Sequence, residues 1–495
     1  MPNRETNKQR FILLPATSLQ ANNETNPNVT DFLLELSGHT MSRSAVRLST
    51  RSATRSKTMN VKVVDSIHEN GAKLVEIKED EMADFRFSYP GLRIIPEKFY
   101  RRAFVRHEIE FKVKKSQVRA GIQLTITDNV KKPVRGIYVV AFTDFESRIG
   151  DSGTSNAKGV VTLKLDSKKI ERLYVYPDHS YWGFFKKNFT IGTALEIKLQ
   201  NIDLNFTDSL RHFYDTRNWG KIENTVRVGV IDTGVGPHAD LQVKGGANTV
   251  FGENQTDFKD NGEGHGTHVA GIIAAHGGIH GVAAGAEIYS YRVFPKGKSA
   301  SNFDIMKAID QARTDGCDII NMSLGEEDLD EGIVSSIKDA HSAGILCFAA
   351  NGNEERSPVS FPAFYSLCVA VSAMGRKGTF PAATVQSGIV HAPYGTDKNN
   401  FIADFSNIGP ETDLTAPGVG IISTFPDNLY AVMDGTSMAC PAAAGIAARL
   451  LSTQPAILNL PRGQQRADEM LKFLATKIRA MGFGANFEGK GMLVV

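Results

Sequence analysis

The stretch Gly435-Thr436-Ser437-Met438-Ala439 sets a serine among small residues, directly ahead of an apolar run. Two fragments stand upstream of it: Val-Gly-Val-Ile-Asp-Thr-Gly at 228–234 and Gly-His-Gly-Thr-His-Val-Ala-Gly at 264–271. In chain order they supply a carboxylate (Asp232), an imidazole (His265) and a hydroxyl (Ser437). A serine hydroxyl is inert at neutral pH and becomes nucleophilic when an adjacent base takes its proton. The three residues are therefore a candidate acid, base and nucleophile.

The sequence around each candidate predicts its location. Asp232 ends an apolar strand, the position where catalytic groups gather in open parallel sheets. His265 opens a predicted helix over 266–275, and Ser437 precedes a run of small apolar residues at 438–450 that is typical of a buried helix. The positive end of a helix dipole favours a developing oxyanion. The alternative for Ser437 is a simple helix-capping residue.

From about residue 205 apolar strands alternate with helical stretches. Four apolar residues of the predicted helix 302–314 (Ile305, Ala308, Ile309, Ala312) fall on one face. Strands that alternate with helices predict a parallel sheet covered on both faces, an α/β fold over residues 203–495. The predicted strands are 227–231, 287–293, 318–323, 344–349 and 367–371.

Two other regions precede this one. Residues 1–106 are predicted to form a small α+β domain, with strand, turn, strand, helix and strand over 59–106 and the helix at 79–88. Within it, 17–58 is rich in Ser, Thr and Arg and is predicted to be mostly a mobile insertion, although 31–36 can order locally.

Residues 107–202 contain six short alternating segments separated by turn signals, which indicates a β-sandwich. The aromatic stretch 181–185 is interpreted as a core or hairpin cluster in preference to a recognition surface. The sequence leaves open a protein partner at the sandwich.

The order Asp, His, Ser, with all three motifs, resembles the subtilisin-like serine peptidases (subtilases, peptidase S8). The resemblance implies a three-layer α/β/α catalytic domain and a serine endopeptidase that works through an acyl-enzyme on Ser437. It also implies that His265 is catalytic and His268 structural. Asn353 is the implied oxyanion donor, with Asn351 as its rival. Backbone of Ser323, Leu324 and Gly325 would pair with an extended peptide substrate, and Ser360 would lie at the base of the specificity pocket.

The stretch 59–106, together with the predicted strand at 10–15, resembles the inhibitor-I9-like propeptide of that family, most of all in Pro-Gly-Leu-Arg-Ile-Ile-Pro-Glu at 90–97. The resemblance implies a zymogen-like partner in cis. Its sheet would contact surface helices of the enzyme and its extended tail would lie in the cleft, so that it assists folding and inhibits. An unrelated adaptor domain is the alternative.

Composition excludes several classes. The 495 residues carry a net charge of +2, which favours neither a nucleic-acid partner nor a membrane surface, and no apolar run is long enough to span a bilayer. The N-terminal apolar run is shorter than a secretory signal requires, so a cytoplasmic location is expected. The four cysteines lie in apolar segments and are predicted to be buried thiols.

No cofactor or metal is expected. Residues 276–282 lack the Asn/Asp-rich insertion by which many subtilases bind calcium. The acidic run 326–331 would favour basic substrates if it rims the cleft, but a solvated loop capping the next helix is the preferred interpretation. The alternative function is a protease scaffold held inactive, acting as a partner-regulated effector or binding module.

Overall fold

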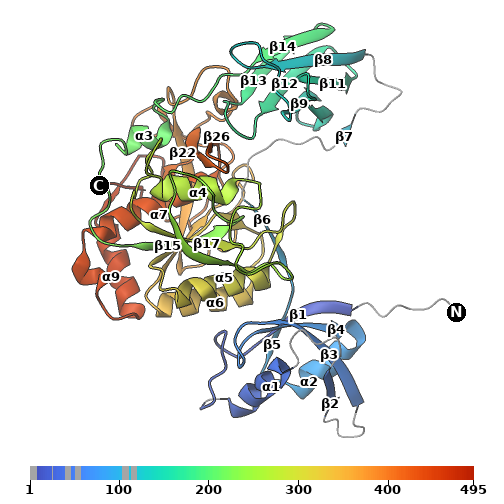
Figure 1. Ribbon diagram of the computed structural model, residues 1–495, viewed down its shortest axis with the longest axis vertical. Helices are drawn as coiled ribbons and strands as arrows, with labels where there is room; N and C mark the ends of the chain where they lie inside the picture. Colours follow the sequence, from blue (N-terminus) through green and yellow to red (C-terminus); the bar gives the residue numbers. More distant parts are fainter. Residues whose placement is uncertain (1–7, 25, 39–45, 51–56, 103–110, 113–119) are drawn as a thin grey trace, which may run out of the picture.

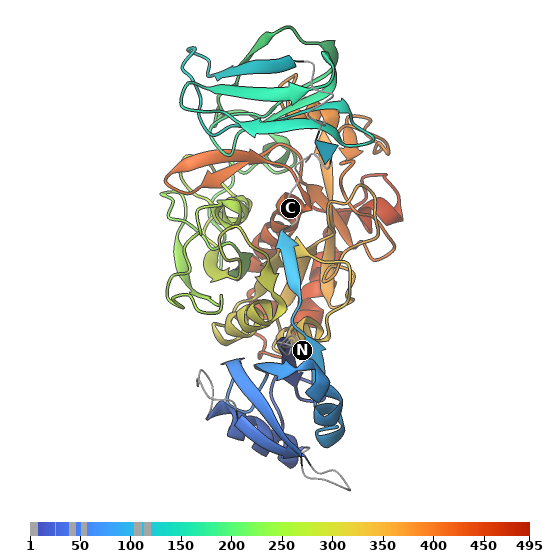
Figure 2. The same ribbon diagram turned by 90° about the vertical axis from the view of Figure 1, so that its right-hand side faces the viewer.

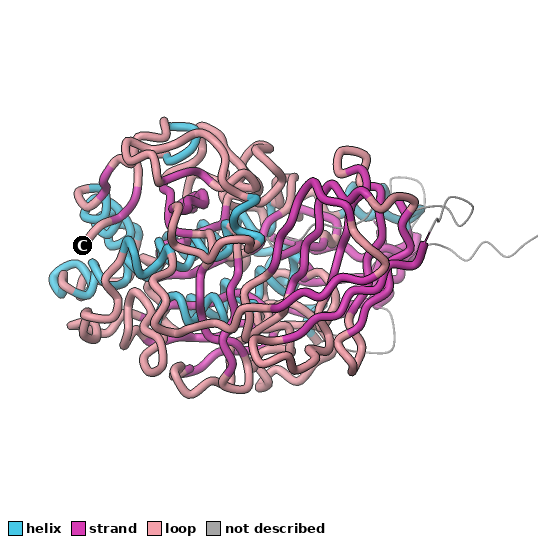
Figure 3. The backbone as a smooth tube through the Cα atoms, turned by 90° about the horizontal axis from the view of Figure 1, so that it is seen from above, coloured by secondary structure: helices cyan, strands magenta, loops and turns pink. Residues whose placement is uncertain are grey.

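The computed structural model describes residues 8–24, 26–38, 46–50, 57–102, 111–112 and 120–495 (Figure 1). Three bodies lie one above another along the long axis of the molecule. The N-terminal domain is at one end, the C-terminal domain is in the middle, and the sheets of the sandwich are at the other end (Figure 2). Seen from above, the strand-rich sandwich lies beside a body that mixes strands and helices (Figure 3).

The C-terminal domain is built on an eight-stranded sheet in the order β16-β17-β15-β19-β21-β22-β23, with β24 also pairing with β22. The pairs are parallel except for β22 with β23. This is the predicted parallel sheet. Its strands are β15 (Arg227–Asp232), β16 (Val243–Asn248), β17 (Glu287–Arg292), β19 (Ile319–Met322), β21 (Leu346–Ala350), β22 (Cys368–Arg376), β23 (Asn400–Ile402) and β24 (Leu414–Pro417).

Helices cover both faces of this sheet because alternate strand residues point to opposite sides. Val228 and Val230 of β15 belong to the same core as α4 (His265–Ala274) and α7 (Thr436–Ser452). Ile231 belongs instead to the core of α5 (Asn302–Thr314) and α6 (Glu331–Ser342). The α/β class is thus confirmed, as is the helix predicted at 302–314. Smaller elements complete the domain: α3 (Ser209–Phe213), β18 (Ala300–Ser301), β20 (Leu324–Gly325), η3 (Val385–Gly388), β25 (Ile421–Phe425), β26 (Leu429–Met433), α8 (Pro455–Leu458), α9 (Gln464–Ala475), β27 (Ile478–Arg479), α10 (Ala485–Glu488) and β28 (Met492–Leu493).

Helices α4 and α7 pack against each other, and their close contact depends on one glycine. A Cβ on Gly445 of α7 would collide with the Val282 side chain and lie 3.3 Å from the Cα of Ile273 in α4. Because α4 begins at His265 and α7 at Thr436, this packing brings the histidine and serine motifs to neighbouring helix ends.

The N-terminal domain is a five-stranded sheet in the order β2-β3-β4-β1-β5 with two helices. Within 17–58, predicted to be mostly a mobile insertion, the local order that was allowed for 31–36 is present and extends over helix α1 (27–37), because Phe32, Leu33 and Leu36 pack in the core of the N-terminal domain. The rest of that stretch falls partly outside the described residues, at 39–45 and 51–56. The elements are β1 (Lys8–Leu14), α1 (Pro27–Ser37), β2 (Val46–Thr50), β3 (Lys57–Ser66), β4 (Lys73–Lys78), η1 (Glu79–Glu81), α2 (Met82–Ser88), β5 (Arg93–Pro96) and β6 (Phe99–Arg102).

This sheet packs on α5 and α6 (Figure 1). Ile95 and other apolar residues of the N-terminal domain share one core with those helices. The Leu19 N–H donates to Asp339 at 3.0 Å, and Lys307 pairs with Asp65 at 2.8 Å. The N-terminal domain is therefore joined to the C-terminal domain by a continuous hydrophobic core and by specific polar contacts.

The sandwich region forms two sheets, β13-β12-β9-β10-β7 and β11-β8-β14, which enclose one apolar core. Two strands, β10 and β13, were not among the predicted segments, and part of the first predicted segment (108–113) lies outside the described residues. The strands are β7 (Phe111–Lys112), β8 (Ala120–Thr127), β9 (Tyr138–Asp144), β10 (Ile149–Thr154), β11 (Val160–Leu165), β12 (Lys169–Tyr176), β13 (Phe184–Thr190) and β14 (Ala194–Lys198).

All four cysteines are buried free thiols, as predicted. Among the helices in the described part of the chain, none is both long and apolar enough to cross a membrane.

Candidate active site

Asp232 and His265 form a buried hydrogen-bonded pair. Asp232 ends β15 and is fully buried, and the His265 side chain is 3% exposed at the start of α4. The Nδ1 of His265 lies 2.8 Å and 2.9 Å from the two carboxylate oxygens of Asp232. This contact fixes the proton on Nδ1 and leaves Nε2 as the basic nitrogen.

The residues beside this pair hold the imidazole in position. A Cβ on Gly266 would come within 3.0 Å of the Cβ of Asp232, so a residue without a side chain lets α4 begin this close to the strand end. Asp260 holds the loop that enters the helix: its carboxylate accepts the N–H groups of Gly262 (2.9 Å) and Gly264 (2.8 Å) and the Thr267 hydroxyl (2.9 Å). Burial raises the pKa of Asp260 above its usual range.

Ser437 lies in the first turn of α7 and is fully buried. Its Oγ donates to the carbonyl of Ser323 at 3.3 Å, and the Ser323 hydroxyl donates to the carbonyl of Ser437 at 3.0 Å. The Nε2 of His265 is buried and, among the described residues, has no hydrogen-bond partner. The hydrogen bond expected between His265 and Ser437 is thus not formed in this structure, although catalytic hydrogen bonds are often long before substrate binds.

His268, in the next turn of α4, occupies a different environment. Its Nε2 donates to the carbonyls of Ile421 (3.0 Å) and Ala431 (3.2 Å). Burial, reinforced by the nearby His265, lowers the pKa of His268 to about 3, so the ring is neutral at any physiological pH. It ties α4 to the β25–β26 hairpin.

Asn353 presents a buried amide donor. Its Oδ1 accepts the backbone N–H (2.9 Å) and the hydroxyl (3.0 Å) of Thr436, the residue before Ser437. Its Nδ2 is buried with no partner among the described residues. A buried amide N–H₂ without an acceptor is costly unless a ligand supplies one. Asn351, the rival, donates to Thr412 at 2.8 Å and to the carbonyl of Asn407 at 3.3 Å, so its amide hydrogens are used structurally.

A strand of the N-terminal domain lies in the cleft beside these residues. β6 pairs antiparallel with β18 on one side and β20 on the other, joining Arg102 to Leu324 and Arg101 to Gly325. It enters the middle of the C-terminal domain from below (Figure 2). The Tyr100 side chain is fully buried there, and burial raises its pKa. Leu324 and Gly325 thus pair with an extended chain, and Ser323 contacts Ser437.

Ser360 lies against the same edge. Its Cβ is 3.2 Å from where a Cβ on Gly325 would be, and its hydroxyl accepts from Asn407 at 3.2 Å. In the acidic run 326–331, Asp330 accepts the N–H groups of Gly332 (2.9 Å) and Ile333 (3.0 Å). That run therefore caps α6, as the preferred interpretation had it.

The family model described as "Subtilase family" matches residues 223–477, the region that holds the three motifs and the parallel sheet. The chain belongs to the subtilase family. Its C-terminal domain is a subtilisin-like serine endopeptidase domain.

Curated subtilases match the same region. Subtilisin Savinase of Lederbergia lenta is 37% identical over 246 residues, which is 49% of this chain and 82% of that protein. M-protease of Shouchella clausii (strain KSM-K16) is also 37% identical over 246 residues, 58% of its length. Alkaline elastase YaB of Bacillus sp. (strain YaB) is 39% identical over 238 residues, 48% of this chain and 56% of that protein. The chain therefore spans little more than half the length of two of these three relatives.

Two features of this subtilase site were not found from the sequence: the Asp260 network, and Glu263, whose carboxylate pairs with Arg102 and accepts the Gly297 N–H at 2.6 Å. A tail of the N-terminal domain in the cleft was expected from the family resemblance, but residues 99–102 were not identified as its strand. Asp-Asn-Gly-Glu-Gly at 260–264 carried a signal, since Asp before Gly is typical of side-chain-capped turns. The pairing of Arg102 with Glu263 carried none, because it joins residues far apart in sequence. Among the described residues, no group of three or more His, Cys, Asp or Glu side chains is arranged to hold a metal ion.

Proposed function

We propose that this protein is a serine endopeptidase that cleaves extended polypeptides through Asp232, His265 and Ser437, and that its own N-terminal domain inhibits it. The observation that carries the proposal is the strand β6, which is paired on both sides in the cleft. A cleft that takes an added strand recognises main chain and takes peptide in preference to a small ester.

The direction of β6 supports the same proposal. From Phe99 to Arg102 the strand runs toward Leu324, the residue after Ser323, which in turn contacts Ser437. A substrate bound in this direction presents its next peptide bond to the serine hydroxyl. His265 would take the proton from Ser437, Asp232 would stabilise the imidazolium, and Asn353 would donate to the oxyanion.

The test is covalent labelling with a fluorophosphonate, which reacts with an activated serine. We expect one equivalent of label on Ser437 in the wild-type chain, and no label on the Ser437→Ala variant. Casein cleavage should be lost in the same variant. Full labelling of the variant would refute the nucleophile. A wild type that stays unlabelled after its N-terminal domain has been removed would favour the inactive scaffold instead.

The inhibitory role of β6 makes a second prediction. The Arg102 guanidinium pairs with Glu263, two residues before His265, and both side chains are largely buried (28% and 17% exposed). Arg102→Glu places two carboxylates face to face. The repulsion should weaken the binding of β6 in the cleft by about 1 kcal/mol or more. We expect the uncleaved chain to react with the fluorophosphonate about fivefold faster, measured on samples whose intact mass has been verified.

Arg101→Glu is the matched control because Arg101 is the exposed neighbour in the same strand. It carries the same change of charge without facing Glu263. If both variants accelerate labelling equally, the effect comes from net charge, and the Arg102–Glu263 ion pair does not keep β6 bound in the cleft.

A further inference from the structure

The sandwich is joined to the C-terminal domain by backbone hydrogen bonds as well as by sequence. The Ser180 N–H donates to the carbonyl of Tyr430 at 2.7 Å. The Phe185 N–H donates to the carbonyl of Ala383 at 2.9 Å, next to a bridge between Phe184 and Thr384. These bonds fix the position and orientation of one end of the sandwich relative to the hairpin β25–β26 and to the segment before η3.

Apolar side chains complete the joint. Trp182 is 1% exposed and contacts Phe206 edge-on at 5.3 Å between ring centroids. Phe185 and Val385 belong to one apolar cluster that spans both bodies. The aromatic stretch 181–185 is thus neither an exposed recognition surface nor a purely internal core, because part of it is the joint itself. Domains joined by a buried, hydrogen-bonded interface move little relative to each other.

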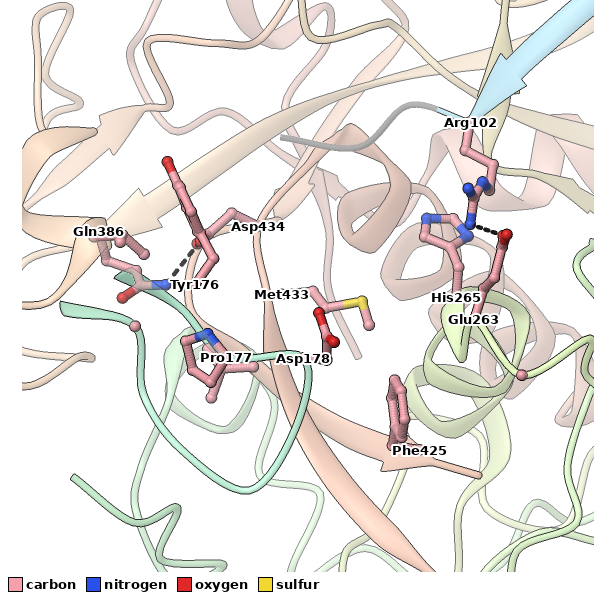
Figure 4. Close-up of a pocket in the computed structure, with 14 residues that line it drawn as sticks. Arg102, Tyr176, Pro177, Asp178, Glu263, His265, Gln386, Phe425, Met433 and Asp434 are labelled. Carbon is pink, nitrogen blue, oxygen red and sulfur yellow. Dashed lines mark hydrogen bonds and ion pairs between the residues drawn. The ribbon is translucent and has the colours of Figure 1, made fainter. Parts of the chain in front are cut away.

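Beside this joint lies a cavity of about 350 Å³ whose walls come from both bodies (Figure 4). His265 and Glu263, with Arg102 of β6, stand at one end. Tyr176 and Pro177 of the sandwich stand opposite. Other lining residues include Asp178, Gly183, Phe425, Met433 and Asp434.

The chain direction of β6 in the cleft indicates which part of a substrate this cavity would contact. β6 approaches Ser437 along β20, so residues ahead of a scissile bond would lie along β18 and β20. Arg102 and His265 line one end of the cavity, and its lining also includes Met433 and Asp434, which lie shortly before Ser437 in the chain. It therefore faces the residues that follow the scissile bond, the leaving side.

The lining combines apolar walls with carboxylates. Tyr176, Phe425 and Met433 offer apolar surface, and Asp178 and Asp434 add carboxylates. The Asp434 carboxylate accepts from the Gln386 amide (2.7 Å) and the Gly420 N–H (2.7 Å), and burial raises its pKa to about 6. Such a site fits a long side chain with an apolar body and a positive end.

We infer that the sandwich is a working part of the peptidase: residues 176–178 and Gly183 form the far wall of a leaving-side binding site that accepts the residues after the scissile bond, with a preference for lysine or arginine. The inference rests on the proposed function and deepens it by assigning a part of the substrate to the sandwich. It makes the sandwich a determinant of cleavage specificity in place of a separate adaptor.

The experiment compares two substrates that are identical up to the scissile bond. One ends in a small anilide, and the other continues for four residues beyond the bond, with lysine, glutamate or alanine in turn at the first three. We expect Tyr176→Ala to lower kcat/KM for the extended peptides about tenfold more than for the anilide. We expect Asp178→Lys to shift the lysine-over-glutamate preference about fivefold toward glutamate.

Tyr138→Ala is the matched control. Tyr138 stacks on Tyr176 within the sandwich at 6.3 Å between ring centroids but does not line the cavity. It should cost the sandwich a similar ring contact and leave the ratio of the two substrates as in the wild type. Equal losses on both substrates with Tyr176→Ala, or the same change of ratio with Tyr138→Ala, would overturn the inference. Absence of cleavage of both substrates by the wild type, anilide included, would overturn the proposed function itself.

Discussion

Replacing His265 by alanine should lower kcat about a million-fold on any peptide substrate. The size is the one known for a subtilisin that loses its catalytic histidine. The physical reason is that the His265 imidazole is the group expected to take the proton of the Ser437 hydroxyl, whereas the carbonyl of Ser323, which the Ser437 Oγ contacts, can accept a hydrogen bond but cannot take a proton. Asp232→Asn should cost about 10⁴-fold, because an amide in place of the carboxylate selects the wrong tautomer of His265.

The measurement is kcat on an unstructured peptide, normalised to protein that shows the wild-type melting temperature. His276→Ala is the matched control, since His276 is an exposed histidine just beyond the same helix. It should leave kcat within a factor of two. Retention of more than a tenth of the activity by His265→Ala would mean that another group activates the serine, and the assignment of the base would have to be abandoned.

The three candidate motifs could be located from the sequence because they are local. Each of Asp232, His265 and Ser437 lies where a strand or helix meets a short turn, so a few neighbouring residues define both the element and the side chain. The parallel sheet was predictable for a related reason. Its strands are buried on both faces and form continuous apolar runs, separated by helices with a clear period.

The exact long-range pairings were not predictable. The family resemblance implied that a tail of the N-terminal domain lies in the cleft, but the pairing of β6 with β18 and β20 joins residues about 200 positions apart, and the sequence of Phe99–Arg102 alone does not predict a strand. Only residues 31–36 of helix α1 were recognised as able to order, because the polar and Asn-rich surroundings resemble a mobile loop and the apolar face is stabilised only by packing on the N-terminal sheet. Tertiary packing overrode the local composition there.

The joint between the sandwich and the C-terminal domain is a third such case. The aromatic residues at 181–185 have the composition of an ordinary core, and only their placement shows that Trp182 and Phe185 bridge two bodies. Composition indicates that a side chain will be buried, but it does not say which body will bury it.

Removing the amide donor of Asn353 should lower kcat by about 10²–10³, with little change in KM, because the donor meets charge that exists only in the tetrahedral intermediate. The magnitude is that of a subtilisin deprived of its oxyanion-hole asparagine. Asn353→Asp is the sharpest variant. It keeps an oxygen to accept from the N–H and hydroxyl of Thr436, while its second oxygen replaces the buried Nδ2 donor.

Asn353→Leu provides the comparison, because it removes the donor together with both contacts to Thr436 and so tests packing as well. If the oxyanion role is right, Asn353→Asp should lose at least as much kcat as Asn353→Leu even though it preserves more of the hydrogen bonds at the start of α7. The negative charge would oppose the developing oxyanion directly. Affinity for a boronic acid that mimics the tetrahedral intermediate should fall in parallel. An Asn353→Asp variant with near-normal kcat would show that the Nδ2 of Asn353 faces some other group, and that the oxyanion relies on backbone donors alone.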